Sequence, residues 1–183
     1  MRFNTEQQRQ HGISLVECAV AVAVAAITLS TAAPGFASFI EKRRIDGVAA
    51  QLAADIHFAR SEAARRQATV RLSLKADANS SCWIVHTGAA RDCRCDATGN
   101  PVCDAGLEAL KATRLPAGER IVVSGNVASM LFDPLHGTST PAGTLKVSGA
   151  SGRAVQHVVN VMGRVRTCSP QGAAPALAGY RVC

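Results

Sequence analysis

Two arginines separated by one residue stand near the end of the chain, in the segment Gly163-Arg164-Val165-Arg166. In an extended strand alternate residues point to the same face, so the guanidinium groups of Arg164 and Arg166 are expected side by side, about 7 Å apart. This separation matches the spacing of phosphates along one DNA strand, and a planar guanidinium binds phosphate with two hydrogen bonds. The pair therefore predicts a phosphate-binding site, with a solvated strand face as the alternative.

Seven cysteines are many for a chain of this length, and six of them lie beyond an N-terminal apolar segment. An even number in that position indicates an oxidising compartment and disulfide bonds. Cys168 and Cys183 flank a loop rich in Pro, Gly and Ala, and we expect them to pair and to hold the C-terminus near the two arginines. The other four are expected to pair among themselves, in an order that the sequence leaves open: Cys82, Cys93, Cys95 and Cys103.

Neither a metal site nor an active site is expected. Zinc is the alternative use of the four cysteines, but Cys93-Arg94-Cys95 lacks the spacing of two to four residues that zinc ligands usually have. The sequence contains no Ser-His-Asp or Cys-His order, no glycine-rich phosphate loop, and only isolated histidines (His11, His57, His86, His136 and His157). We therefore predict a protein that is not an enzyme and that has no cofactor.

The apolar segment from Ile13 to Ala33 contains one charged residue, Glu17. As a helix, a segment of this length spans about 30 Å, the thickness of a bilayer core. A carboxylate there costs about 2.5–3.5 kcal/mol unless it has a partner. A secretory signal, a plain signal anchor and a buried core helix are three interpretations of the segment, and none of them supplies a partner for Glu17.

The charge of the chain favours anionic partners. The formal net charge is +7, and from Glu41 onward 18 Lys and Arg residues oppose 11 Asp and Glu residues. Such a surface attracts polyanions or anionic membranes, although solubility alone is the plainer explanation. Aromatic residues make up only 4% of the chain, so the core is expected to be aliphatic.

The spacing of apolar residues predicts one long helix followed by strands. A helical stripe continues beyond the apolar segment, so the helix is expected from about Ile13 to Arg66, loosened at Pro34-Gly35, with Asp55 and Glu62 on its solvent side. The period then changes to two, and strands are expected at residues 69–74, 82–86, 120–124, 130–132, 144–147 and 155–165. This order indicates an α+β fold with an antiparallel sheet.

Three segments carry a resemblance to a known family. GISLVECAVAVAVAAI resembles the class III signal of type IV pilins and pseudopilins, in which a glycine precedes an apolar run with glutamate at its fifth position. The passage from helix to strand at residues 59–72 and the Gly-Arg-x-Arg motif resemble those of the FimT/GspH branch of minor pilins and pseudopilins. Ile13, Ser14, Val16 and Cys18 depart from the usual signal residues, and residues 75–120 match no family pattern.

The resemblance implies processing and assembly at a membrane. A prepilin peptidase would cut between Gly12 and Ile13, Ile13 would be N-methylated, and Glu17 would pair with the new terminal amine during assembly with other pilins. Residues 1–12 would be the leader, 13–40 the transmembrane and filament-core helix, and 41–183 a globular head. The protein would cross the inner membrane once, with its head in the periplasm, and would later join a pilus at the cell surface.

The resemblance also implies a ligand. In DNA-binding FimT-like minor pilins of naturally competent bacteria, the Gly-Arg-x-Arg motif carries DNA uptake, so Arg164 and Arg166 are expected to bind double-stranded DNA without sequence specificity. Arg181 and Arg153 would widen the site. The alternative is a GspH-like pseudopilin of a type II secretion system, or a structural or priming minor pilin, without DNA binding.

Overall fold

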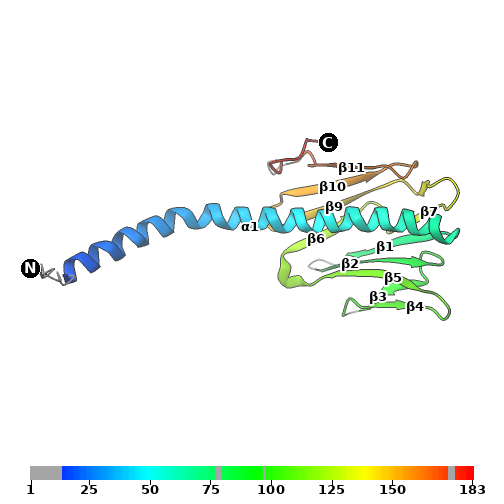
Figure 1. Cartoon of the computed structure of the whole chain (residues 1–183), viewed down its shortest axis with the longest axis horizontal. Helices are drawn as coiled ribbons and strands as arrows, with labels where there is room; N and C mark the ends of the chain where they lie inside the picture. Colours follow the sequence, from blue (N-terminus) through cyan, green and yellow to red (C-terminus); the bar gives the residue numbers. More distant parts are fainter. Residues whose placement is uncertain (1–13, 77–79, 97, 173–175) are drawn as a thin grey trace, which may run out of the picture. The chain divides into compact units, whose positions relative to one another are not determined.

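The protein, seen here as a computed structural model, is described over residues 14–76, 80–96, 98–172 and 176–183 (Figure 1). It forms two compact units, an N-terminal unit of Met1–Ile40 and a head of Glu41–Cys183. Helix α1, Leu15–Arg66, supplies residues to both units. The helix ends where the sequence predicts, and the first residue of the expected range, Ile13, lies outside the described residues.

In the N-terminal unit, the described side chains of α1 up to Ile40 are all exposed, among them Leu15 at 86% and Leu29 at 70%. No single helix in the described part of the chain is long and apolar enough to cross a membrane. The segments Leu15–Thr31 and Gly35–Arg66, taken together across a bend of 41°, meet that requirement by length and composition alone.

The described residues of the head form three antiparallel sheets, with strand orders β5-β2-β1-β7-β8, β11-β10-β9-β6 and β3-β4. The strands are β1 (Val70–Ala76), β2 (Ser81–Thr87), β3 (Cys93–Cys95), β4 (Pro101–Cys103), β5 (Ala109–Leu115), β6 (Ile121–Gly125), β7 (Ser129–Phe132), β8 (Ser139–Thr140), β9 (Gly143–Gly149), β10 (Ala154–Val159) and β11 (Val165–Cys168). A short 3-10 helix, Ala117–Glu119, precedes β6. The predicted α+β fold with antiparallel sheets is confirmed.

Five of the six expected strands correspond to β1, β2, β6, β7 and β9, each within two residues at either end. The sixth expectation, one strand over residues 155–165, is wrong because β10 and β11 are separate strands joined by a turn. Strands β3, β4, β5 and β8 were not expected from the sequence.

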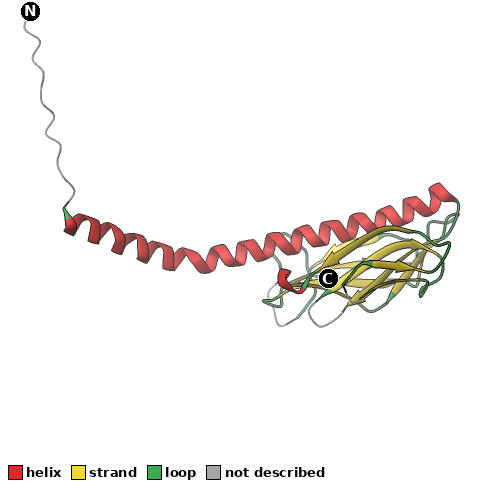
Figure 2. Ribbon diagram, turned by 90° about the horizontal axis from the view of Figure 1, so that it is seen from below, coloured by secondary structure: helices red, strands yellow, loops and turns green. Residues whose placement is uncertain are grey.

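The core of the head lies between α1 and the sheets (Figure 2). The helix buries Ile45, Leu52 and Ile56 completely, and Trp83 and Phe132 are the largest side chains packed with them. Each fully buried aliphatic side chain of this kind contributes about 1.5–3 kcal/mol. Every buried side chain of the described residues falls between residues 45 and 177, so the head has its own core and is expected to fold without the N-terminal unit.

The end of α1 is fixed by backbone and charge. Gln67 adopts a left-handed conformation, with φ of +51°, and the amide of Ala68 donates to the carbonyl of Ala63 at 3.3 Å, which closes a Schellman turn. Glu62 was expected on the solvent side but is only 7% exposed. Hydrogen bonds from Arg65 and then Arg66 lower the pKa of Glu62 to about 2.

Asp55 is the second carboxylate of α1 that was expected on the solvent side, and it is completely buried. The indole N–H of Trp83 donates to Oδ2 at 2.8 Å, and the Thr113 hydroxyl donates to the same oxygen at 3.2 Å. The amide of Gln51 donates to Oδ1 at 2.9 Å, and the ammonium of Lys111 lies 2.5 Å from that oxygen. One carboxylate therefore joins α1 to β2 and β5.

We predict that Asp55→Ala destabilises the oxidised head (residues 41–183) by at least about 1–3 kcal/mol, because it leaves the buried N–H of Trp83 without an acceptor. Urea denaturation would measure the free energy of unfolding. Asp55→Asn keeps the shape and one acceptor oxygen, so its loss should be smaller. A loss within about 0.5 kcal/mol for Asp55→Ala, as for an ordinary surface substitution, would contradict the role given to this carboxylate.

Candidate nucleic-acid interface

The Gly-Arg-x-Arg motif lies at the turn between β10 and β11, not inside one long strand. The amide of Asn160 donates to the carbonyl of Arg164 at 3.1 Å, and the amide of Gly163 donates to the carbonyl of Asn160 at 2.9 Å. Gly163 has φ of +69°, which favours glycine and is typical of the last residue in a three-residue hairpin loop. The apolar residues Val161 and Met162 inside this turn concealed it in the sequence.

Gly163 is also required by the close approach of a second turn. A Cβ atom added at Gly163 would lie 2.5 Å from the carbonyl oxygen of Gly137, which is too short for any contact. The amide of Ser139 donates to the carbonyl of Val161 at 2.9 Å, and its hydroxyl donates to the carbonyl of Asn160 at 2.7 Å. The turn that carries the motif is therefore held from both sides.

Arg164 and Arg166 are both exposed, and Val165 between them is partly buried and packs against the core. Arg164 precedes the strand, whereas Arg166 is its second residue and pairs with Val158. Because β10 is the only strand beside β11 in the described sheet, β11 forms its edge. In the described part of the chain neither guanidinium has a hydrogen-bond or ion-pair partner, so both are available to an anion.

Arg60 lies at the same turn, although it was expected only as one of the polar residues of α1. A Cβ atom added at Gly163 would lie 3.2 Å from Arg60 Nε, and one added at Gly137 would lie 3.0 Å from the same nitrogen. The Arg60 guanidinium therefore lies against both turns, at the residue that precedes Arg164. It is half-buried and has no hydrogen-bond or ion-pair partner among the described residues. The sequence could not identify this approach, which depends on how α1 packs.

The two arginines that were expected to widen the site have different surroundings. Arg181 is exposed, and its carbonyl accepts a hydrogen bond from the amide of Ser169 at 2.8 Å, which places its backbone beside the end of β11. Arg153 instead donates to Glu41 at 2.8 Å and to Ser151 at 3.1 Å. Its charge is compensated, so we leave Arg153 out of the site.

One carboxylate lies in the neighbouring turn. Asp133 accepts hydrogen bonds from the amides of Leu135 at 2.9 Å and His136 at 2.8 Å. The hydrogen bond from the His136 amide is the main cause that holds the pKa of Asp133 below its ordinary value, so this group is charged at neutral pH. The Asp133 carboxylate interacts with groups of its own turn, and its Oδ1 also lies 3.1 Å from Nδ1 of His136.

The six cysteines downstream of the apolar segment form three disulfide bonds, Cys82–Cys95, Cys93–Cys103 and Cys168–Cys183. The last bond ties the C-terminus to the end of β11, beside the exposed arginines. The other two fasten the β3–β4 hairpin internally and to β2. Cys18 is free and exposed. In the ranges that the structure describes, no group of three or more His, Cys, Asp or Glu side chains is arranged to hold a metal ion.

At the other end of the chain, Gly12 and Ile13 lie outside the described residues. Ser14 precedes α1, and its hydroxyl oxygen accepts a hydrogen bond from the amide of Glu17 at 3.2 Å. Ser14 is therefore the N-cap of the helix, and Glu17 occupies the third helical position, the spacing of a capping box.

Comparisons with known proteins identify the family. A family model described as type II transport protein GspH matches residues 48–163, which is more than half of the chain. No curated protein sequence matches the chain. Among solved structures, the type IV minor pilin FimU of Pseudomonas aeruginosa (strain PAO1) is similar, with 18% identity, a TM-score of 0.49, and coverage of 74% of this chain and 99% of that chain. The predicted family is confirmed, and the protein belongs to the FimT/GspH family of minor type IV pilins and pseudopilins.

Proposed function

We propose that this protein is a minor type IV pilin whose head binds double-stranded DNA without sequence specificity, for uptake in natural transformation. The observation that carries the proposal is the cluster of uncompensated guanidinium groups at the β10–β11 turn. Arg164 and Arg166 are exposed there without a described partner, the Arg60 side chain lies against Gly163 of the same turn, and the backbone of Arg181 lies beside Ser169 after the end of β11. We call these four residues the arginine edge.

The chemistry of the arginine edge fits a phosphate backbone. A guanidinium group donates two parallel hydrogen bonds to a phosphate, and several such groups along one edge can follow successive phosphates. The net charge of +7 adds long-range attraction for a polyanion. Large exposed aromatic side chains on which bases could stack are not part of this edge, so the contacts favour a duplex over unstacked single strands.

The N-terminal part of the proposal concerns assembly. A prepilin peptidase would cut after Gly12 and leave Ile13 as a methylated terminal amine, close in sequence to the carboxylate of Glu17. The exposed apolar surface of α1 up to Ile40 would first lie in the inner membrane and then in the filament core. The head would face the periplasm, and then the surface of the pilus, where DNA can reach it.

A second candidate function is favoured by the matched family description, which names a type II transport protein. In that case the chain would be a GspH-like pseudopilin, or a structural or priming pilin, and the arginine edge would be a solvated surface. The same membrane helix and processing would serve both functions. DNA binding by the head separates the two candidates.

We predict that Arg164→Gln with Arg166→Gln weakens DNA binding by the oxidised head by about tenfold or more at low salt, because two phosphate contacts are lost. Gel shift with unrelated duplexes would measure the affinity, and its salt dependence should fall by about 2 in log–log slope. The matched control is Arg91→Gln with Arg94→Gln, which removes the same charge near β3. This strand and β11 lie on opposite sides of the head (Figure 1). Equal losses for both double variants would show that only net charge matters, and no loss for either would favour the second candidate.

A separate prediction concerns Arg60. Arg60→Gln should lower DNA affinity by several-fold and reduce the salt slope by about 1, since one further phosphate contact is lost. Arg60→Lys keeps the charge and should retain most of the affinity, which distinguishes a contact with phosphate from packing of the turn. Arg120→Gln is the control. Arg120 is exposed and precedes β6, which forms one edge of the sheet whose other edge is β11. An effect of Arg120→Gln as large as that of Arg60→Gln would show that only net charge matters.

The processing prediction is tested on the full chain, expressed with a prepilin peptidase. Mass spectrometry should find a mature protein that begins at Ile13 and carries one methyl group on its amine. Gly12→Val, which places a branched side chain at the expected cut, should leave the leader attached. An intact Met1 in the wild type, or a mature protein that begins near Ala33, would refute the processing site.

A further inference from the structure

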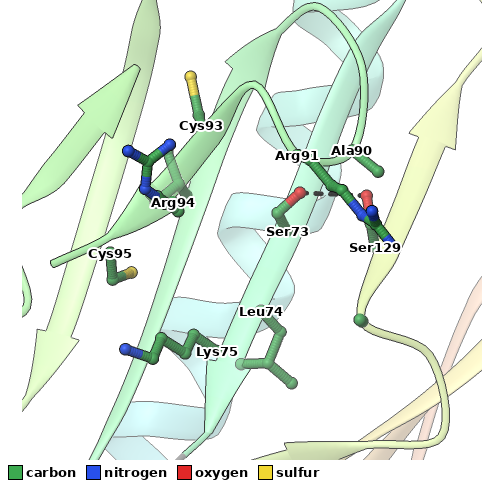
Figure 3. A pocket seen from close by; sticks show the side chains of 11 residues that line it. Ser73, Leu74, Lys75, Ala90, Arg91, Cys93, Arg94, Cys95 and Ser129 are labelled. Atoms are coloured by element: carbon green, nitrogen blue, oxygen red, sulfur yellow. Dashed lines mark hydrogen bonds between the residues drawn. The ribbon is translucent and has the colours of Figure 1, made fainter. Parts of the chain in front are cut away.

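The disulfide-bonded β3–β4 hairpin borders a cavity, partly open to solvent, that the proposed function does not use. Cys93–Cys103 closes the hairpin, and Cys82–Cys95 fastens β3 to β2. Between β3 and the strands β1, β2 and β7 lies a cavity of about 510 Å³ (Figure 3). This volume falls within the range of about 300–1,000 Å³ that is common for sites of small ligands. The two disulfides hold the wall of the cavity in place, so its shape is largely preformed.

The floor of the cavity is apolar with two hydroxyl groups at one end. Ile84 and Ala128 provide the apolar part. Ser73 and Ser129 provide the hydroxyl groups, whose oxygens lie 3.1 Å apart. An occupant would therefore meet an apolar surface along most of its length and hydrogen-bonding groups at one end.

A buried polar network fixes the two hydroxyl groups. Burial is the main cause that lowers the pKa of His86, so its ring is neutral at pH 7. Its Nδ1–H donates to the carbonyl of Thr87 at 2.8 Å, and its Nε2 therefore accepts from the hydroxyl of Ser73 at 2.8 Å. Arg71 donates to the hydroxyl oxygen of Ser129 at 3.3 Å, and its buried Nε has no acceptor among the described residues. Positive charge thus underlies the polar end of the floor.

The rim of the cavity is cationic. Arg91, Arg94 and Lys75 line it, and none of the described lining residues is acidic. Figure 3 shows the guanidinium group of Arg91 next to Ser129, while Arg94 and Lys75 extend on the other side. Arg94 lies 3.8 Å from Asp104, but both side chains are more than 60% exposed, so water screens this pair. The cavity therefore combines an apolar body with the positive charge of Arg91 and Arg94 at its rim.

We propose that this cavity is a binding site for a small amphipathic anion, with its carboxylate or sulfonate held by Arg91 and its apolar body under β3, against Ile84 and Ala128. The ligand is a discrete small molecule, because a chain of phosphates would leave the apolar floor without a partner. The site is independent of the arginine edge, which lies on the other side of the head (Figure 1). It gives a function to the cysteine-rich hairpin, which has no part in the proposed DNA site.

The test uses the oxidised head and two kinds of probe. Anilinonaphthalene sulfonate, an apolar fluorophore with one anionic group, should bind with one-to-one stoichiometry and increased fluorescence. Octanoate should displace it, and octanol, which has the same chain without the charge, should displace it far less. Equal displacement by octanol would overturn the requirement for an anion.

Two matched pairs of variants locate the site. Arg91→Gln with Arg94→Gln should weaken binding of the fluorophore by about tenfold or more, and Arg164→Gln with Arg166→Gln should leave it unchanged. Ala90→Trp fills the cavity from its lining without altering charge and should abolish binding, whereas Trp at the exposed neighbour Ala89 should not. Near-ultraviolet circular dichroism would verify that each variant is folded.

Three results would overturn the proposal. The first is equal weakening by both arginine double variants, which would indicate attraction to net charge. The second is binding to folded Ala90→Trp, which would place the fluorophore elsewhere. The third is displacement by duplex DNA from the wild type, which would make the cavity part of a DNA surface. None of these results bears on whether Arg164 and Arg166 bind DNA, so the two proposals can fail separately.

Discussion

The burial of one face of α1, fixed by the carboxylate of Asp55, determines where everything else in the head can lie. Apolar packing alone allows a helix to slide or rotate on a sheet at small cost, because aliphatic side chains of similar volume substitute for one another. A buried carboxylate with donors from Trp83 on β2 and Thr113 on β5 permits one position only. Any shift of α1 would leave these donors without a partner inside the core.

Arg60 owes its position to this constraint. It follows Asp55 by five residues, about 7.5 Å along the same helix, and meets the two turns at Gly137 and Gly163. Those turns are in close contact, since a Cβ atom added at Gly163 would collide with the Gly137 carbonyl oxygen. The helix, the turn at residues 133–140 and the β10–β11 turn therefore support the arginine edge together. Rigid support matters for phosphate binding because it reduces the side-chain and loop entropy that is lost on association.

The sequence predicted the parts of the fold that follow from periodicity. The stripe of α1 and the strands β1, β2, β6, β7 and β9 each have a regular apolar pattern and a turn signal beside them. Strand β5 was missed because its residues, Ala109–Leu115, alternate only weakly, and the β10–β11 turn was missed because its tip is apolar. The burial of Asp55 could not be predicted from the sequence, because its hydrogen-bond donors Trp83 and Thr113 lie 28 and 58 residues away in the chain.

The residues of the candidate sites also differ in whether the sequence alone could identify them. Arg164 and Arg166 are separated by one residue and could be found by spacing, whereas Arg60 reaches the same turn only through tertiary packing. The cavity under β3 could not be predicted from the sequence, because it too depends on tertiary packing. Its lining comes from β1, β2, β3 and β7 together, and the disulfide Cys82–Cys95 that fastens its wall was one of several pairings that the sequence allowed. The spacing of cysteines predicts that a hairpin is cross-linked by disulfides, but it does not predict a cavity beside that hairpin.

For Glu17, the free energy of helix capping can be compared with the cost of placing a carboxylate in a bilayer. The structure gives this residue a local role, because Ser14 caps the helix and Glu17 stands at the third helical position. A favourable interaction with the helix dipole contributes about 0.3–1 kcal/mol, and an N-cap contributes about 1 kcal/mol. A carboxylate in a bilayer costs about 2.5–3.5 kcal/mol. In the proposed membrane location, local capping would offset only part of this cost, and the proposed terminal amine of Ile13, four residues earlier, would supply a countercharge for the remainder.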